Sequence, residues 1–137
     1  MKKFLSKSLL VEKRQSSLRI TVSPSTLTDW CLCLQLLHEN LIEAFVFLSC
    51  ASSQPVEVTC GDTSHYGSIC QRDRLTVVLC ERDLDYARHF FFRYYRDGIA
   101  EVDHIDIQAE GGDYITILVE EPIPPVSSEE AKRRLGM

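Results

Sequence analysis

Serine, histidine and tyrosine stand side by side near residue 65, and these residue types can support nucleophilic catalysis. Ser64, His65 and Tyr66 are consecutive, with Cys60 and Asp62 close by. A catalytic nucleophile needs a base within hydrogen-bond reach and a third group that orients this base. No GxSxG-type motif surrounds the serine, and adjacent strand residues point to opposite faces. We therefore interpret Asp62 to Tyr66 as a turn whose polar side chains bond to their own backbone, with a small enzyme or ligand-binding site as the alternative.

A second polar group belongs to two late strands. His104, Asp106 and Glu120 share the outer face of a hairpin predicted over residues 102–120. A histidine flanked by carboxylates can act as a base or bind a metal, although on an exposed sheet it is more often a solvated side chain. We expect a surface group here, with a catalytic role for His104 as the alternative.

Metal and cofactor sites need motifs that the sequence lacks. The six cysteines lie in apolar segments and form no CxxC pair: Cys31, Cys33, Cys50, Cys60, Cys70 and Cys80. The six glycines form neither a GxGxxG nor a Walker pattern. We expect mostly buried, reduced thiols, no metal and no cofactor.

The element that organises the chain is a helix predicted over residues 82–98. Its core stripe recurs at helical spacing and consists of Leu84, Ala87, Phe91 and Tyr94 or Tyr95, with Tyr86 and Phe90 at its edge. The opposite face places Phe92 among Arg88, Arg93 and Arg96. An exposed aromatic ring rimmed by guanidinium groups is typical of a protein interface. We favour the interpretation that Phe92 is covered by the chain's own sheet or by a terminal segment, with the exposed interface anchor as the alternative.

The first half of the chain alternates strand and helix signals. Strands are predicted over 9–13, 17–22 and 56–60, and a hairpin over 68–71 and 75–80. Ser23 and Pro24 predict the start of a helix that runs to about Asn40, and Thr26 with Asp29 is a second possible capping pair. Residues 44–50 are predicted as a strand or a second short helix, and the alternative is one long helix that reaches residue 48.

The late hairpin joins residues 102–109 to 114–120. A three-residue loop, Gly111 to Asp113, would pair Ala109, Ile107 and Ile105 with Ile115, Ile117 and Val119 and keep apolar residues together. After the proline-rich stretch, Ser127 and Glu130 form a capping box that predicts a short helix ending at Gly136, with a frayed tail as the alternative.

Length and composition predict one α+β domain, with a mainly antiparallel sheet of five to six strands packed against two main helices. A chain of 137 residues can bury a sizeable core, and its net charge of −5 argues against general nucleic-acid binding. The N-terminus lacks the apolar core of a signal peptide, and no apolar run approaches a membrane span. We expect a cytoplasmic protein without a membrane or nucleic-acid partner.

Two surfaces are candidates for binding a protein partner. The first is the helical face with Arg88, Phe92, Arg93 and Arg96. The second is an acidic group that would steer a basic partner such as a nuclease, formed by Glu101, Asp103, Asp106, Asp113, Glu120 and Glu121. A homodimer is a further alternative.

The segment Tyr66 to Leu79 resembles small bacterial immunity proteins of polymorphic-toxin and contact-dependent growth inhibition systems. The matching residues are Tyr66, Gly67, Ile69, Arg72, Asp73, Arg74 and Leu75, whereas His65 and Ser68 replace glycines of the family pattern. The resemblance implies a cytosolic, acidic α+β inhibitor without enzymatic activity. We therefore expect a non-enzymatic immunity protein that neutralises a cognate toxin by binding it. The alternatives are the small enzyme or ligand-binding domain and a self-associating accessory subunit.

Overall fold

A computed structural model describes most of the chain. The described residues are 1–50, 52–61, 68–71, 74–97, 104–109, 112–120 and 136. The predicted Asp62 to Tyr66 turn therefore lies outside the described residues, and so does the predicted C-terminal helix apart from Gly136. The segment that resembles immunity proteins is described except at residues 66, 67, 72 and 73.

Two helices and nine strands are described in the order β1 (Lys2–Phe4), β2 (Leu10–Lys13), β3 (Ser17–Val22), α1 (Leu27–His38), β4 (Ala44–Leu48), β5 (Pro55–Gly61), β6 (Ser68–Gln71), β7 (Leu75–Cys80), α2 (Glu81–Asp97), β8 (His104–Gln108) and β9 (Tyr114–Val119). The α+β class and the two main helices are confirmed. Within the described residues, none of the helices is long and apolar enough to cross a membrane.

The strands form two sheets rather than one. The five-stranded sheet has the order β1-β4-β5-β7-β6, and the four-stranded sheet has the order β2-β3-β9-β8. Both are mixed, because β1 pairs with β4, β5 with β7 and β3 with β9 in parallel. Four of the seven described strand pairs are antiparallel, so the prediction of mainly antiparallel pairing is confirmed, but the strands form two mixed sheets rather than the predicted single sheet of five to six strands.

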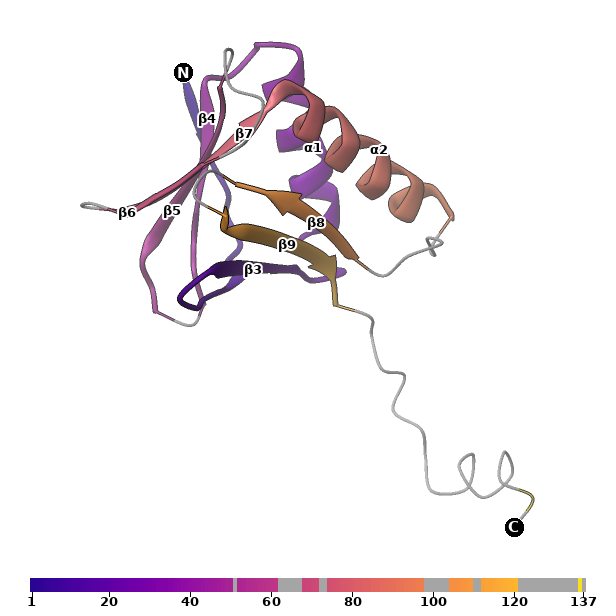
Figure 1. Cartoon of the computed structure of the whole chain (residues 1–137). Coiled ribbons are helices and arrows are strands. Elements are labelled where there is room, and N and C mark those ends of the chain that lie inside the picture. Colours follow the sequence, from indigo (N-terminus) through magenta and orange to yellow (C-terminus); the bar gives the residue numbers. More distant parts are fainter. Residues whose placement is uncertain are drawn as a thin grey trace.

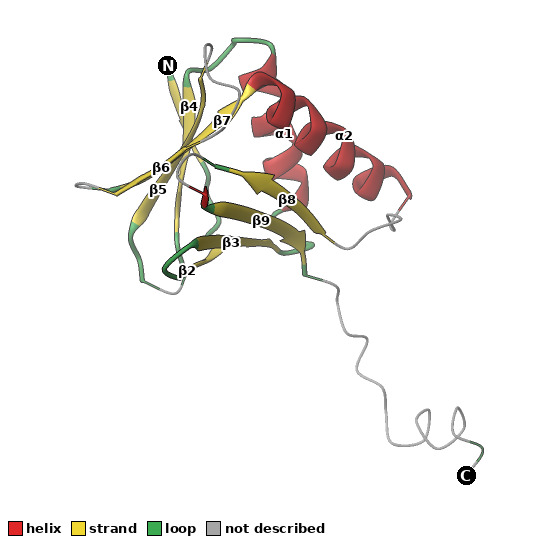
Figure 2. Cartoon of the chain, viewed as in Figure 1, coloured by secondary structure: helices red, strands yellow, loops and turns green. Residues whose placement is uncertain are grey.

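Both helices cover the inner faces of the sheets (Figures 1 and 2). The sheets diverge from a junction where the backbone N–H of Leu9 donates to Leu48 and that of Cys50 donates to Leu9. A single apolar cluster contains residues from both sheets and both helices, with Trp30, Phe45 and Phe91 fully buried in it. This continuous cluster is what the pattern of one domain predicts.

The ends of α1 are set by local hydrogen bonds. Thr26, rather than Ser23, is the N-cap residue, and its hydroxyl donates to the carbonyl of Ser23. Pro24 therefore belongs to a turn that precedes the helix, and the helix begins three residues later than predicted. Residues 44–48 are a strand, one of the two forms that the prediction left open, and the long helix to residue 48 is ruled out because Asn40 at φ 59° ends the helix.

The late hairpin turns the predicted residues toward the core, but the register between its two strands is shifted. Ile105 pairs with Ile117 and Ile107 with Ile115, so apolar residues lie opposite each other on the core side. The predicted partner of Ile107 was Ile117, two residues further along. The N–H of Ala109 donates to the carbonyl of Asp113 at 2.8 Å, so Ala109 is opposite Asp113 rather than Ile115.

Candidate partner-binding surface

Helix α2 carries the predicted residues Arg88, Phe92, Arg93 and Arg96. The two helices are antiparallel, since Trp30 of α1 contacts Phe91 of α2 and Gln35 contacts Arg88 further back along α2. Phe91 is fully buried, whereas its neighbour Phe92 keeps 37% of its surface exposed. Of the two predicted states of Phe92, the structure therefore has the exposed one, the alternative to the favoured interpretation.

Arg88 lies in the seam between the helices and holds them together. Its side chain is 21% exposed, and it donates to Asp85 Oδ1 at 2.7 Å and to Gln35 Oε1 at 3.2 Å. The hydrogen bond from Arg88 is the main reason that the pKa of Asp85 lies below its usual value. The guanidinium group is thus directed to the chain's own side chains rather than to solvent.

Arg93 and Arg96 are exposed near the end of α2. Arg96 forms two hydrogen bonds to Asp97, at 2.8 Å and 3.0 Å, which raise the pKa of Arg96 and lower that of Asp97. A surface pair of this kind contributes little to stability but keeps the guanidinium group in place.

Two further exposed side chains belong to the helix pair: Leu32, which the sequence pattern did not single out, and Tyr95, which it placed with Tyr94 as a candidate for the core stripe. Leu32 is 44% exposed and comes three residues before Gln35, and Tyr95 is 55% exposed and follows Arg88 by seven residues. Leu32 lies one turn before Gln35 in α1, and Phe92 lies one turn after Arg88 in α2. Because the helices are antiparallel, helical periodicity places Leu32 and Phe92 at the same level, and Tyr95 follows one turn later in α2. We call Leu32, Phe92, Arg93, Tyr95 and Arg96 the helical patch. Leu32 could have been found from its position off the apolar stripe of α1.

The predicted acidic surface is described only in part. Asp103 and Glu121 lie outside the described residues, as does Glu101. Asp106 is exposed on the outer face of the four-stranded sheet, where it accepts a 2.6 Å hydrogen bond from Thr116. Glu120 is exposed just beyond the end of β9. These carboxylates point away from the core on the sheet side, and the helical patch points away from it on the helix side.

The predicted alternative site at His104 is a surface pair. Its Nε2 lies 3.4 Å from Asp106 Oδ2, and both side chains are about half exposed, at 47% and 53%. Glu120 is two residues beyond Leu118, the pairing partner of His104, so the structure does not bring it opposite the histidine. Across the described part of the chain, no group of three or more His, Cys, Asp or Glu side chains is placed to hold a metal ion.

Comparison with known proteins identifies a similar fold. No family model and no curated protein matches the sequence. Among solved structures, the chain is similar to Drosophila Suppressor of Fused, with a TM-score of 0.50 and 10% sequence identity. The match covers 85% of this chain and 27% of that one. At this identity the likeness concerns the fold alone.

Proposed function

We propose that this chain is a non-enzymatic binding protein, most concretely an immunity protein that neutralises a bacterial toxin by binding it. The observation that carries the proposal is the helical patch, in which Phe92 is 37% exposed beside two exposed arginines. Arginine and aromatic side chains dominate the energetically important positions of protein interfaces. The resemblance of Tyr66 to Leu79 to immunity proteins supports the toxin as the class of partner.

The patch has the layout of a small interface centre. Leu32, Phe92 and Tyr95 supply apolar and aromatic surface on two helices that the seam at Arg88 holds in fixed relation. A surface that is already ordered loses less entropy when a partner binds. Arg93 and Arg96 add positive charge to a chain whose net charge is −5. The contact surface of the partner is therefore expected to carry carboxylates.

The proposal is tested by partner capture and reconstitution. Tagged wild type, Phe92→Asp and Tyr86→Asp are used to capture proteins from a lysate of the source organism, and the retained protein is then purified and assayed alone. Tyr86 is the matched control, because it is an aromatic residue of the same helix and is 53% exposed. Its side chain leaves the helix axis in a direction about 120° from that of Phe92.

The expected result is a heterologous protein with a toxin domain that wild type and Tyr86→Asp retain and inhibit. Phe92→Asp should lose retention and inhibition while its melting temperature falls by only a few degrees, about the effect of 1 kcal/mol in a domain of this size. Retention of nothing but the chain itself would favour the self-associating alternative. Equal retention by all three proteins would exclude the helical patch as the contact surface.

A further inference from the structure

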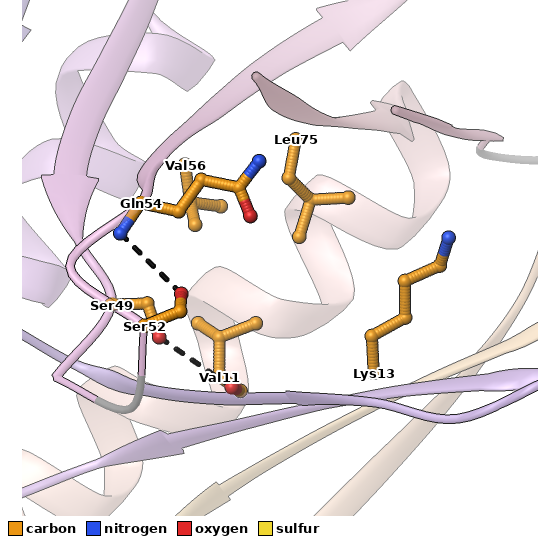
Figure 3. Close-up of a pocket in the computed structure, with 7 residues that line it drawn as sticks. All are labelled: Val11, Lys13, Ser49, Ser52, Gln54, Val56 and Leu75. Carbon is orange, nitrogen blue, oxygen red and sulfur yellow. Dashed lines mark hydrogen bonds between the residues drawn. The ribbon is translucent and has the colours of Figure 1, made fainter. Parts of the chain in front are cut away.

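The outer face of the four-stranded sheet is turned away from the helices and the core. Side chains of β2 alternate between the two faces of this sheet: Val11 and Lys13 line a cavity of about 180 Å³ where the two sheets diverge (Figure 3), whereas Glu12 lies on the outer face. Along β3, Leu18 is fully buried and its neighbour Arg19 is exposed. The outer face therefore presents a set of side chains that the core does not use.

Two hollows lie on this outer face, because β3 contributes the short side chains Ser17 and Thr21 before and after Arg19. The Ser17 hollow has a volume of about 200 Å³ and is lined by Glu12, Arg14, Ser17, Arg19 and Thr116. The Thr21 hollow has a volume of about 420 Å³, and its lining includes Leu10, Glu12, Arg19, Thr21, Leu118 and Glu120. Since Glu12 and Arg19 line both, the two hollows adjoin.

The charged side chains of the Ser17 hollow are available to a ligand. Among the residues that the structure describes, Glu12, Arg14 and Arg19 form no ion pair and no side-chain hydrogen bond, although Glu12 is the direct cross-strand neighbour of Arg19. Two guanidinium groups outnumber one carboxylate here, and the half-buried Ser17 adds a hydroxyl group. Because arginine binds carboxylates through paired, charge-assisted hydrogen bonds, this hollow favours a carboxylate.

The Thr21 hollow favours an apolar group instead. Leu10 and Leu118 are half-buried and flank Thr21 as its partners in the two neighbouring strands. Two carboxylates, Glu12 and Glu120, outnumber the one guanidinium group in the lining, so a second anion would be repelled. An aliphatic side chain that covers the two leucines removes apolar surface from water.

We propose that the two hollows bind an extended segment of a partner protein in which one residue separates an acidic residue from an aliphatic one. Side chains two positions apart in an extended chain point to the same side, about 7 Å from each other. This spacing matches two hollows that adjoin at Arg19. The carboxylate meets Arg14 and Arg19, and the aliphatic side chain lies on Leu10 and Leu118. The site is on the opposite side of the molecule from the helical patch and does not depend on it.

The test is a titration of the full chain with capped pentapeptides, followed by amide NMR spectra. Acetyl-Ser-Asp-Ser-Leu-Ser-amide and its reverse, acetyl-Ser-Leu-Ser-Asp-Ser-amide, carry the proposed spacing in the two chain directions. Acetyl-Ser-Asp-Leu-Ser-Ser-amide has the same composition but places the two side chains on opposite sides of an extended chain. Two further peptides replace the aspartate by asparagine or the leucine by alanine. Each is added to about 20 mM, well above a Kd on the order of 1 mM, and the signals of Glu12, Arg19, Thr21 and Thr116 are followed.

The proposal expects saturable shifts at these four residues with the proposed spacing in at least one direction, and binding at least about fivefold weaker for the other three peptides. Arg14→Met and Arg19→Met should each weaken binding by a similar factor. Glu12→Gln should strengthen it, because the carboxylate that competes for the two arginines is removed. Arg82→Met is the matched control and should leave binding unchanged, since this arginine is 74% exposed at the start of α2.

Several results would overturn the assignment. Equal binding of the aspartate and asparagine peptides would mean that the arginines play no part, and weaker binding after Glu12→Gln would mean that the site prefers a cation. Shifts of the same signals when the protein alone is concentrated would make a second copy of the chain the occupant. Shifts at residues 126–137 in the Arg19→Met protein without peptide would make the chain's own C-terminal segment the occupant. The helical-patch experiment affects none of these results, since the two surfaces share no residue.

Discussion

The indole ring of Trp30 meets the ring of Phe45 edge-on, with the ring centroids 5.4 Å apart and the planes at 90°. Phe47 and Phe91 approach the same indole at 6.2 Å and 5.7 Å, so α1, β4 and α2 converge on one side chain. Trp30 is fully buried, and its Nε1 has no hydrogen-bond partner among the described atoms. Packing, rather than hydrogen bonding, holds this residue in place.

Replacing Trp30 separates these two contributions. Trp30→Ala should lower the free energy of unfolding by about 3–5 kcal/mol, because it leaves a large cavity at the centre of the core. Trp30→Phe should cost clearly less, about 1–2 kcal/mol, since it retains an aromatic ring and removes the unpaired N–H group. Urea unfolding followed by circular dichroism measures both values. Equal losses would mean that the indole N–H has a partner in solution.

A substitution of Asn40, at the C-terminal end of α1, should stabilise the protein. The N–H of Leu41 donates to the carbonyl of Leu36 and that of Asn40 to the carbonyl of Leu37, the two bonds of a Schellman motif. Asn40 has a φ of 59°, which glycine adopts without strain. Asn40→Gly should therefore raise the free energy of unfolding by up to about 1 kcal/mol, and Asn40→Val should lower it by more than that.

A matched control stands one residue earlier. Glu39 has a φ of −85°, so Glu39→Gly should destabilise the helix end by about 0.5–1 kcal/mol instead. Thermal unfolding of the three variants compares the signs directly. A loss of stability in both glycine variants would show that Asn40 leaves the left-handed region in solution.

Glu57 links two cations across the outer face of the five-stranded sheet. Its carboxylate lies 3.1 Å from Lys2 Nζ and 3.3 Å from Arg74 Nη1, and its side chain is 13% exposed. Glu57→Gln should lower the free energy of unfolding by about 1–2 kcal/mol, because both cations lose their partner. Lys2→Met or Arg74→Met should each cost less than about 1 kcal/mol, since one cation remains beside the carboxylate.

A double-mutant cycle on Glu57 and Lys2, measured by denaturant unfolding at low and high salt, tests this linkage. A coupling energy near zero at low salt would mean that Lys2 does not anchor β1 to the sheet. The Glu57 effect should shrink as salt is added, because partly exposed charges are screened.

The cysteines should differ strongly in reactivity. Burial raises the pKa of Cys31 to about 12 and that of Cys33 to about 11, whereas Cys50 is exposed. At equal pH the thiolate of Cys31 is then about a thousandfold scarcer than that of an ordinary cysteine. Alkylation of the native protein followed by mass spectrometry should label Cys50 first and both helix cysteines only after denaturant is added.

Cys50→Ser provides the control, since it should abolish the fast labelling and leave the slow labelling unchanged. Early labelling of Cys33 in native protein would contradict the packing of α1. Protection of all thiols even in denaturant would indicate disulfides rather than the free thiols of the structure.

Local sequence patterns were sufficient to predict most of the helices and strands. The spacing of Leu84, Ala87 and Phe91 predicted α2 within a residue or two, because a helix with one apolar face repeats every 3.6 residues. The alternation of apolar and polar residues likewise predicted β3 at 17–22, and it predicted that Ile105 and Ile107 face the core. The sequence offered both Ser23 and Thr26 as the N-cap of α1, because both are good capping residues, and the choice between them depends on the turn before the helix.

The candidate sites were predictable to a smaller extent. The helical wheel identified Phe92 and its arginines, but only the contact with Gln35 places Arg88 in the seam. The two hollows beside Arg19 had no signal in the sequence, since their lining residues come from segments more than 90 positions apart in the chain.

The sequence by itself determined most of the secondary elements and the α+β class, because hydrophobic periodicity and capping act over a few neighbouring residues, but it did not predict β1 and left residues 44–48 between strand and helix. Only the tertiary structure decided that nine strands divide into two mixed sheets, that β3 lies beside β9, and that a cavity opens where the sheets diverge. Strand pairing across a long separation is selected by the fit of the whole core, so no local pattern records it.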